Sequence, residues 1–236
     1  LLGMFVQATV DHNVVISSAS NTLPQLLANW ENSDYPNIPA LDGSRIMFDG
    51  MSLGGMLGVA IGATAPELDG AYLVNGAGSL MQIFSESTFW DDFTSNVIPQ
   101  NMSGAELTFV LAMMQHYVDI ADGNNFAHLY RNPPSGRAPR PMGMHYSLGD
   151  GSLTNDATRA SAEIADLPLL KEVIEPEPSL RYGEEGLDRF ENGFGLVQSG
   201  FGLELADETL NSFKEFDIGG TLGLDDAGPL AGLLGI

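Results

Sequence analysis

The alternation of apolar and polar positions predicts short buried strands separated by helices. Three apolar runs bounded by turn residues predict strands, at residues 45–48, 70–75 and 142–148. Apolar residues at helical spacing predict helices, at residues 1–10, 53–63, 105–120 and 156–165. This order of strands and helices is typical of a parallel sheet with right-handed crossovers, so the predicted fold class is α/β.

The segments between these elements carry the strongest turn and loop signals. Pro24, Pro36 and Pro39 are expected to interrupt the connection to the first strand, and residues 132–141 form a proline-rich connector. From Gly183 onward the chain becomes rich in glycine and acid, and its repeated GFGL predicts a hairpin or a bulged strand. We therefore divide the chain into an α/β core at residues 1–182 and an acidic, glycine-rich segment at residues 183–236.

Charge and composition exclude several classes of function. The chain has 236 residues, with 31 Asp and Glu against 9 Lys and Arg, so its formal net charge is −22. A field of this sign repels nucleic acid and anionic lipid headgroups. No apolar run is long enough to cross a bilayer. The absence of cysteine excludes disulfides, and no spacing fits a metal site or a phosphate loop, so we expect no cofactor.

The first predicted strand runs directly into Gly50-Met51-Ser52-Leu53-Gly54. G-x-S-x-G between a strand and a helix is typical of a nucleophile elbow, in which the serine occupies a strained backbone position. The turn exposes the serine hydroxyl and directs the next amide, that of Leu53, toward a developing oxyanion. The alternative is a glycine-rich turn that only packs a helix against the sheet.

The surrounding sequence is similar to that of the large bacterial lipase and esterase group of the α/β-hydrolases. The similarity lies in LDGSRIMFDGMSLGGMLG at residues 41–58, AYLVNGAGS at 71–79, VDIADGNNFA at 118–127 and GDGSLTN at 149–155. It covers roughly residues 1–170, with Met51 where a histidine is usual and Thr154 where a proline is usual. The resemblance implies a mostly parallel sheet flanked by helices and a secreted or cell-envelope location. We expect this chain to hold only part of that fold, with the early strands of the sheet missing.

By position in this resemblance, Ser52 is the nucleophile and Asp150 is the acid that orients a histidine. The residues themselves support Asp150, because it follows an apolar strand in a glycine turn, downstream of the serine. Alternatively Asp150 is an ordinary turn aspartate, with Asn155 or Asp156 capping the next helix. Asp156 is the weaker candidate for the acid, since the capping role suits it better.

A general base downstream of Asp150 is missing. The four histidines, His12, His116, His128 and His145, all precede it, whereas a serine hydroxyl needs a base to become nucleophilic. Two hypotheses follow. The chain is a segment of a longer serine hydrolase that cleaves carboxylic esters through an acyl-serine, or it is a relative without catalysis that binds a ligand or partner.

The expected partner is a small-molecule ester or a lipid substrate. Met51, Leu53 and Phe84 give the elbow apolar surroundings, which suit an acyl group. An acidic structural or adhesive module is a third hypothesis, suggested by the glycine-rich C-terminal segment. The oligomeric state does not follow from the sequence.

Overall fold

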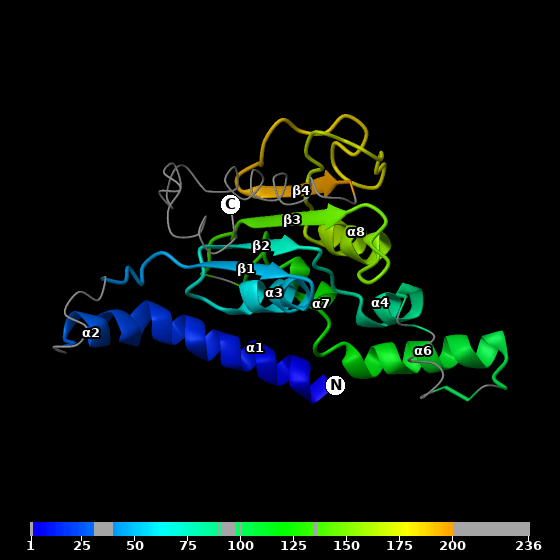
Figure 1. Cartoon of the computed structure of the whole chain (residues 1–236), viewed down its shortest axis with the longest axis horizontal. Helices are drawn as coiled ribbons and strands as arrows, with labels where there is room; N and C mark the ends of the chain where they lie inside the picture. The colour runs from blue at the N-terminus through cyan, green and yellow to red at the C-terminus, as the bar shows by residue number, and fades with distance from the viewer. Residues whose placement is uncertain are drawn as a thin grey trace.

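The structure is a computed structural model that describes residues 2–30, 40–88, 90, 98–99, 101–134 and 136–200. Helices and strands alternate along the described chain (Figure 1). The strands are β1 (Met47–Met51), β2 (Gly70–Val74), β3 (Met142–Ser147) and β4 (Phe194–Ser199). The helices are α1 (Leu2–Ser17), the π-helix η1 (Ser18–Thr22), α2 (Leu23–Ala28), α3 (Leu53–Thr64), α4 (Leu80–Glu86), α6 (Gly104–Val118), α7 (Asn124–Ala127) and α8 (Asn155–Ile164).

The four strands form one parallel sheet in the order β1-β2-β3-β4. Met51 pairs with Val74, and Val74 pairs with His145, so the strand ends are in register. All four arrows point the same way in Figure 1, which places the carboxyl ends of the strands at one edge of the sheet. The predicted α/β class, a parallel sheet flanked by helices, is confirmed.

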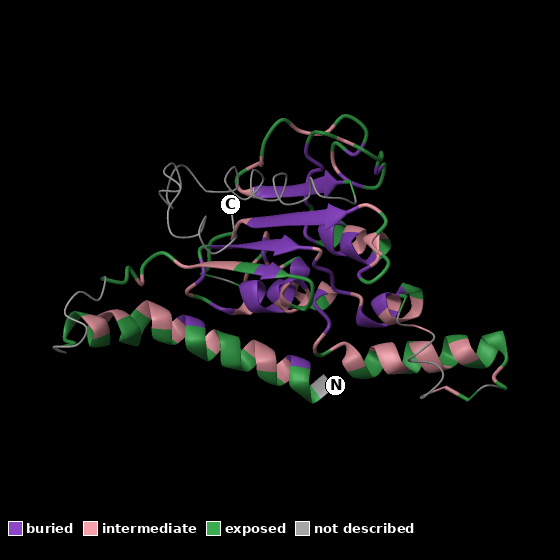
Figure 2. Cartoon of the chain, viewed as in Figure 1, coloured by how far each residue is buried: buried purple, intermediate pink, exposed green. Residues whose placement is uncertain are grey.

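The core lies between one face of the sheet and the helices α3, α7 and α8. Its buried side chains come from β2, β3 and β4 and from these helices, and they include Leu73, Met144, Leu196, Val59 and Ala162. Figure 2 shows the central strands and the inner side of α3 as buried, while α1, α2 and α6 are mostly exposed or half-buried. Burial of this apolar surface is the main force that holds helices on the sheet.

Small residues let α3 lie close to the sheet. A Cβ added at Gly58 would collide with Leu73 and Phe48, and one added at Gly62 would collide with the hydroxyl group of Tyr130. The Tyr130 hydroxyl donates to the carbonyl oxygen of Gly58 at 2.8 Å. The helix after the elbow is therefore fixed by close backbone packing and by a buried hydrogen bond, in addition to its buried side chains Val59 and Ile61.

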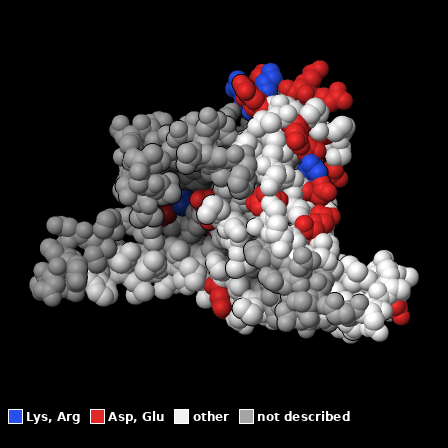
Figure 3. All heavy atoms as spheres, turned by 45° about the vertical axis from the view of Figure 1, so that its right-hand side comes forward, with Lys and Arg blue, Asp and Glu red and all other residues white. Residues whose placement is uncertain are grey.

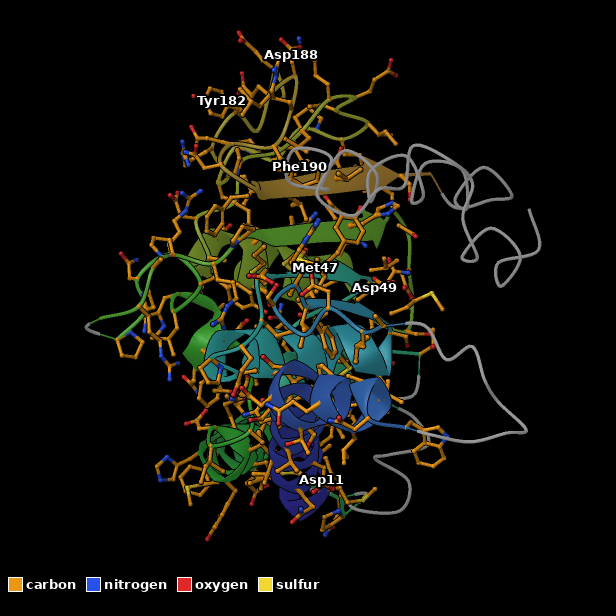
Figure 4. All side chains as sticks on the ribbon, turned by 90° about the vertical axis from the view of Figure 1, so that its left-hand side faces the viewer. Asp11, Met47, Asp49, Tyr182, Asp188 and Phe190 are labelled. Atoms are coloured by element: carbon orange, nitrogen blue, oxygen red, sulfur yellow. The ribbon has the colours of Figure 1, made fainter. Side chains whose placement is uncertain are left out.

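The other face of the sheet holds a smaller apolar cluster. Tyr72 and Val74 of β2 are buried there, with Met47 and Phe190 packed against them. In Figure 4, Met47 and Phe190 lie against the sheet, whereas Tyr182 and Asp188 lie on the outer loops beyond β4.

The outer side of β4 is paired with an irregular segment. Leu196 donates to the carbonyl of Pro168 and accepts from the amide of Leu170, both at 2.8 Å. The sheet therefore extends past position 183, where the sequence changes character. The boundary at 183 stays a prediction, but the structure places residues 194–199 in the same sheet as β1–β3.

Charged side chains are unevenly distributed. No lysine or arginine occurs between Arg45 and Arg131. In the view of Figure 3, most of the charged side chains that are coloured lie in the upper part of the molecule. Among the described residues, the ion pairs of lysine and arginine all lie within residues 131–191. One cluster joins Arg131 and Arg181 to Asp166 and Glu191. A second cluster joins Arg159 to Asp156 and Glu177.

Several element boundaries differ from the sequence predictions. The first helix continues to Ser17 and is followed directly by η1 and α2, so the predicted interruption at Pro24 is wrong. Pro24 lies in the first turn of α2, where a missing N–H leaves no hydrogen bond unmade. Pro36 and Pro39 lie outside the described residues.

The predicted GFGL hairpin is not seen in the part of the chain that the structure describes. Phe194 opens β4, which is parallel to β3. The second copy begins at Gly200, and the rest of it lies outside the described residues. A tight two-residue turn does precede β4, with Asn192 at φ 54° and Gly193 at φ 79°, joining Glu191 to Phe194. The sequence signal therefore marked a turn and a strand, but not their partners.

Within the described ranges, no helix has the length and apolar character needed to cross a membrane.

The Tyr130 hydroxyl gives a test of how α3 is held. We expect Tyr130→Phe to lower the free energy of unfolding by about 1 kcal/mol, because it removes one buried hydrogen bond without opening a cavity. Tyr182→Phe, at an exposed tyrosine, is the control and should change the value by less than about 0.5 kcal/mol. Urea unfolding of both variants measures the difference, and equal effects would contradict the assignment.

Candidate active site

Ser52 occupies the sharp turn between β1 and α3. Its backbone has φ 55° and ψ −119°, a conformation that L-residues rarely adopt. Its N–H donates to the carbonyl of Val74 at 2.9 Å, and its carbonyl accepts from the amide of Met56 at 2.9 Å. The strained turn is thus held by the neighbouring strand on one side and by the first turn of the helix on the other, and the serine is exposed.

The glycines around Ser52 allow close backbone contacts. A Cβ at Gly50 would lie 2.5 Å from the carbonyl oxygen of Gly54, and one at Gly55 would lie 2.7 Å from the Cα of Gly76. At Gly54 a Cβ would meet nothing within 4 Å. Gly50 is therefore required by the turn, because its Cα lies close to the backbone of Gly54. A side chain at Gly54 would meet no such obstacle.

Leu53 begins α3, so its amide belongs to the first turn of a helix. The amides of a first turn have no acceptor within the helix and carry the positive end of its dipole. Such an amide, directly after an exposed serine, is suited to stabilise the negative charge that develops on a carbonyl oxygen when the serine attacks the carbonyl carbon. The geometry is compatible with the oxyanion role predicted for Leu53.

Asp150 lies three residues beyond the end of β3, in a turn of glycines. Its Oδ1 accepts from the amides of Ser152 at 2.8 Å and Leu153 at 3.2 Å. The carboxylate is half-buried and its orientation is fixed by these two bonds. The structure shows no hydrogen bond to its second oxygen, Oδ2, among the described residues, so this oxygen can receive a further donor.

Ser52 and Asp150 lie at the same edge of the sheet but on non-adjacent strands. They follow β1 and β3, with β2 between them. Two strand spacings amount to about 10 Å, which is too far for a direct hydrogen bond between the side chains. A third group is needed to connect them. Beyond β2 the chain continues with Asn75, Gly76, Ala77 and Gly78, three of which are small.

The histidines of the chain do not provide this third group. His12 and His116 are exposed on α1 and α6. His128 follows α7, and the residues on either side of this helix, Gly123 and Tyr130, contact α3 at Val59 and Gly62, away from the first turn of α3. His145 is fully buried within β3. Burial lowers the pKa of His145 to about 4, which keeps the ring neutral but does not bring it to Ser52.

A network beside the elbow was not assigned from the sequence. The buried carboxylate of Asp122 accepts from the amides of Ser79 and Leu80, both at 2.8 Å, and from the amide of Asn124 at 2.9 Å. Asn124 also donates to the Ser79 hydroxyl at 2.5 Å. Two of the segments that carry the family resemblance, 71–79 and 118–127, are therefore bound to each other, and Asp122 fixes the start of α4.

The described residues contain no group of three or more His, Asp or Glu side chains placed to hold a metal ion.

No protein-family model matches the chain, and no curated protein matches it either. Similar solved structures include the acylaminoacyl peptidase of Pyrococcus horikoshii, at 13% identity and a TM-score of 0.43, covering 74% of this chain and 22% of that one. A puromycin-hydrolyzing peptidase of Mycobacterium tuberculosis is 12% identical at a TM-score of 0.47, covering 84% and 24%. Acetyl xylan esterase 1 from Thermoanaerobacterium sp. is 14% identical at a TM-score of 0.40, covering 86% and 52%. This chain thus spans about a quarter of the length of the two peptidases and about half of the length of the esterase.

The backbone strain at Ser52 predicts an unusual order of stabilities. At an ordinary position alanine is more stable than glycine by about 0.5–1 kcal/mol. At φ 55° the side chain adds about 1–3 kcal/mol of strain, so we expect Ser52→Gly to be more stable than Ser52→Ala by about 1 kcal/mol. The same pair at Ser152, an exposed turn serine without a positive φ, should show the opposite order. Denaturant unfolding of the four variants tests this, and the same order at both serines would argue against a strained elbow.

Buried neutral His145 predicts a loss of stability in mild acid. Its pKa is about 4 in the folded chain and 6.5 when exposed, so between these values the unfolded state binds a proton that the native state does not. This contribution is complete above pH 6.5 and falls as the pH drops toward 4, by up to about 3 kcal/mol. We expect His145→Gln to lose less stability between pH 7.5 and pH 5 than the wild type, by about 2 kcal/mol. Urea unfolding of the wild type and of His145→Gln at both pH values provides the measurement, and equal losses of stability would contradict a buried neutral ring.

Proposed function

We propose that this chain carries the nucleophile and the acid of a serine hydrolase that cleaves carboxylic esters. The observation that carries the proposal is the strained, exposed Ser52 at the carboxyl end of β1, directly before a helix N-terminus. A residue in such a conformation persists only where surrounding contacts impose it, and strain of this kind is concentrated at functional sites. Asp150 at the same edge of the sheet supplies the second element.

In the proposed reaction the Ser52 oxygen attacks the ester carbonyl carbon while a base removes the hydroxyl proton. The carbonyl oxygen becomes negative and is stabilised by the Leu53 amide at the N-terminus of α3. The C–O bond to the alcohol then breaks, and the alcohol leaves with the proton from the base. Water hydrolyses the acyl-serine by the same steps and releases the acid.

The side chains next to Ser52 favour an apolar acyl group. Met51 and Leu53, which flank it, are 68% and 56% exposed. The absence of lysine and arginine between residues 45 and 131 leaves no cation from this stretch to bind an anionic substrate. These features support an uncharged ester with an apolar acyl chain in preference to an anionic one.

The general base is proposed to be a histidine from polypeptide outside residues 1–236. Each of the four histidines precedes Asp150, and the structure places them on outer helices, beside the second half of α3 or inside β3. An imidazole between Asp150 and Ser52 would accept the serine proton at one nitrogen and donate to the free carboxylate oxygen from the other.

A relative without catalysis, which binds ligand or partner at this edge of the sheet, is the second candidate. The observation that favours it is the same placement of the histidines, because a serine without a base is a poor nucleophile. The two candidates differ in whether Ser52 becomes reactive when a base is supplied.

Free imidazole can supply that base. We expect a fluorophosphonate probe to modify Ser52 of the 236-residue chain, at a rate that rises with imidazole concentration, with peptide mass spectrometry locating the adduct. Asp150→Asn should lower the imidazole-dependent rate by at least tenfold, because the ring loses its orienting carboxylate. Ser52→Ala should show no adduct.

Ser152→Ala is the matched control and should be modified at the wild-type rate. Modification of a different serine would overturn the assignment of the nucleophile. If no serine reacts at any imidazole concentration, the second candidate is favoured.

A further inference from the structure

We infer that Asn155 is a positioning residue that sets where the Asp150 carboxylate stands relative to Ser52. This inference rests on the proposed function, since it concerns the same site. Its basis is a chain of hydrogen bonds that connects the elbow to the acid turn, in which the Asn155 side chain is the last link.

Both ends of the Asn155 amide are used within the turn. Its Nδ2 donates to the carbonyl of Ser147 at 2.7 Å, and its Oδ1 accepts from the amide of Gly149 at 2.8 Å. The side chain thus bridges the end of β3 and the glycine turn immediately before Asp150. Asp150 itself donates from its amide to the same Ser147 carbonyl at 3.3 Å.

This contact replaces the helix-capping role that the sequence suggested for Asn155. α8 begins at Asn155, and its N-cap residue is Thr154, which makes no capping hydrogen bond with its side chain. Asn155 instead reaches back from the first position of the helix to the preceding turn. The helix therefore serves as a rigid support from which the turn is held.

The turn needs such support because of its glycines. Gly149 has φ 80°, and Gly151 follows directly after Asp150. Glycine has more conformational freedom than any other residue, so a turn with glycines on both sides of the acid is poorly restrained by its own backbone. The two hydrogen bonds of the Asn155 side chain restrict residues 147–150, and only one short side chain has to be ordered for this.

The same network reaches Ser52 through β2. The Ser147 amide donates to Oδ1 of Asn75 at 2.9 Å, and the Asn75 amide donates to the carbonyl of His145 at 2.7 Å. Val74, the residue before Asn75, accepts from the Ser52 amide at 2.9 Å. A continuous series of hydrogen bonds thus connects the backbone of Ser52 to the turn that carries Asp150. Asn155 holds the end of this series at which the acid lies.

An amide is the side chain that this position requires, since one donor and one acceptor are used at the same time. Asn155→Asp keeps an acceptor for Gly149 but loses the donor to Ser147. Asn155→Ala loses both. The expected order of imidazole-dependent Ser52 modification is therefore wild type, then Asn155→Asp, then Asn155→Ala.

The experiment measures the rate of fluorophosphonate modification of Ser52 in the 236-residue chain against imidazole concentration. We expect Asn155→Ala to lower the maximal imidazole-dependent rate by tenfold or more. When the probe concentration is varied at saturating imidazole, the concentration that gives half of the maximal rate should stay unchanged. In the Asp150→Asn background the same substitution should have no further effect, because Asn155 acts through Asp150. A purely structural loss would lower the rate in both backgrounds.

Asn132→Ala, at an exposed asparagine after α7, is the control and should keep the wild-type rate. Should Asn155→Ala fail to fold, Asn155→Asp takes its place in the same comparison. A wild-type rate in the folded variant, or an equal loss in both backgrounds, overturns the positioning role and leaves the proposed function intact. Absence of Ser52 modification in the wild type overturns the proposed function, and the positioning role with it.

Discussion

The site depends on the backbone of a single residue, Ser52, being held in a conformation that its own side chain disfavours. Two hydrogen bonds impose it, one to Val74 of the adjacent strand and one from Met56 of the helix that follows. The contact between Gly50 and the backbone of Gly54 makes the turn tight enough for both. Because the bond to Val74 comes from β2, the elbow cannot form without the sheet. The exposed hydroxyl is therefore a product of strand pairing as much as of the local sequence.

Local sequence signals predicted the elements that carry the site. The apolar run before Gly50, the small-residue helix after Ser52 and the strand before Gly149 all lie within a few residues of their predicted positions. These elements are specified by short-range patterns of burial and by glycines at tight turns. Because the sheet is parallel, Ser52 after β1 and Asp150 after β3 lie at the same edge.

Long-range pairing was much harder to predict. The chain from Pro168 to Leu170 has no strand-like alternation, yet it pairs with β4, and β4 itself was expected as part of a hairpin. The hydrogen-bond partners of Asp122 and Asn155 were equally hidden, because the sequence around a polar side chain does not name its donor or acceptor. Their partners, Ser79 and Leu80 for one and Ser147 and Gly149 for the other, come from other elements or from the far side of a turn. Only the assembled fold shows them.

The uneven distribution of charge means that salt acts on the two halves of this protein in opposite directions. Between residues 45 and 131 there are acids but no lysine or arginine, so added ions weaken mutual repulsion there and favour the compact state. Residues 131–191 contain the clustered arginine–carboxylate contacts, and the same ions weaken attraction in that region. An electrolyte therefore tightens the part of the molecule that bears the nucleophile while loosening the part that supports the outer edge of its sheet.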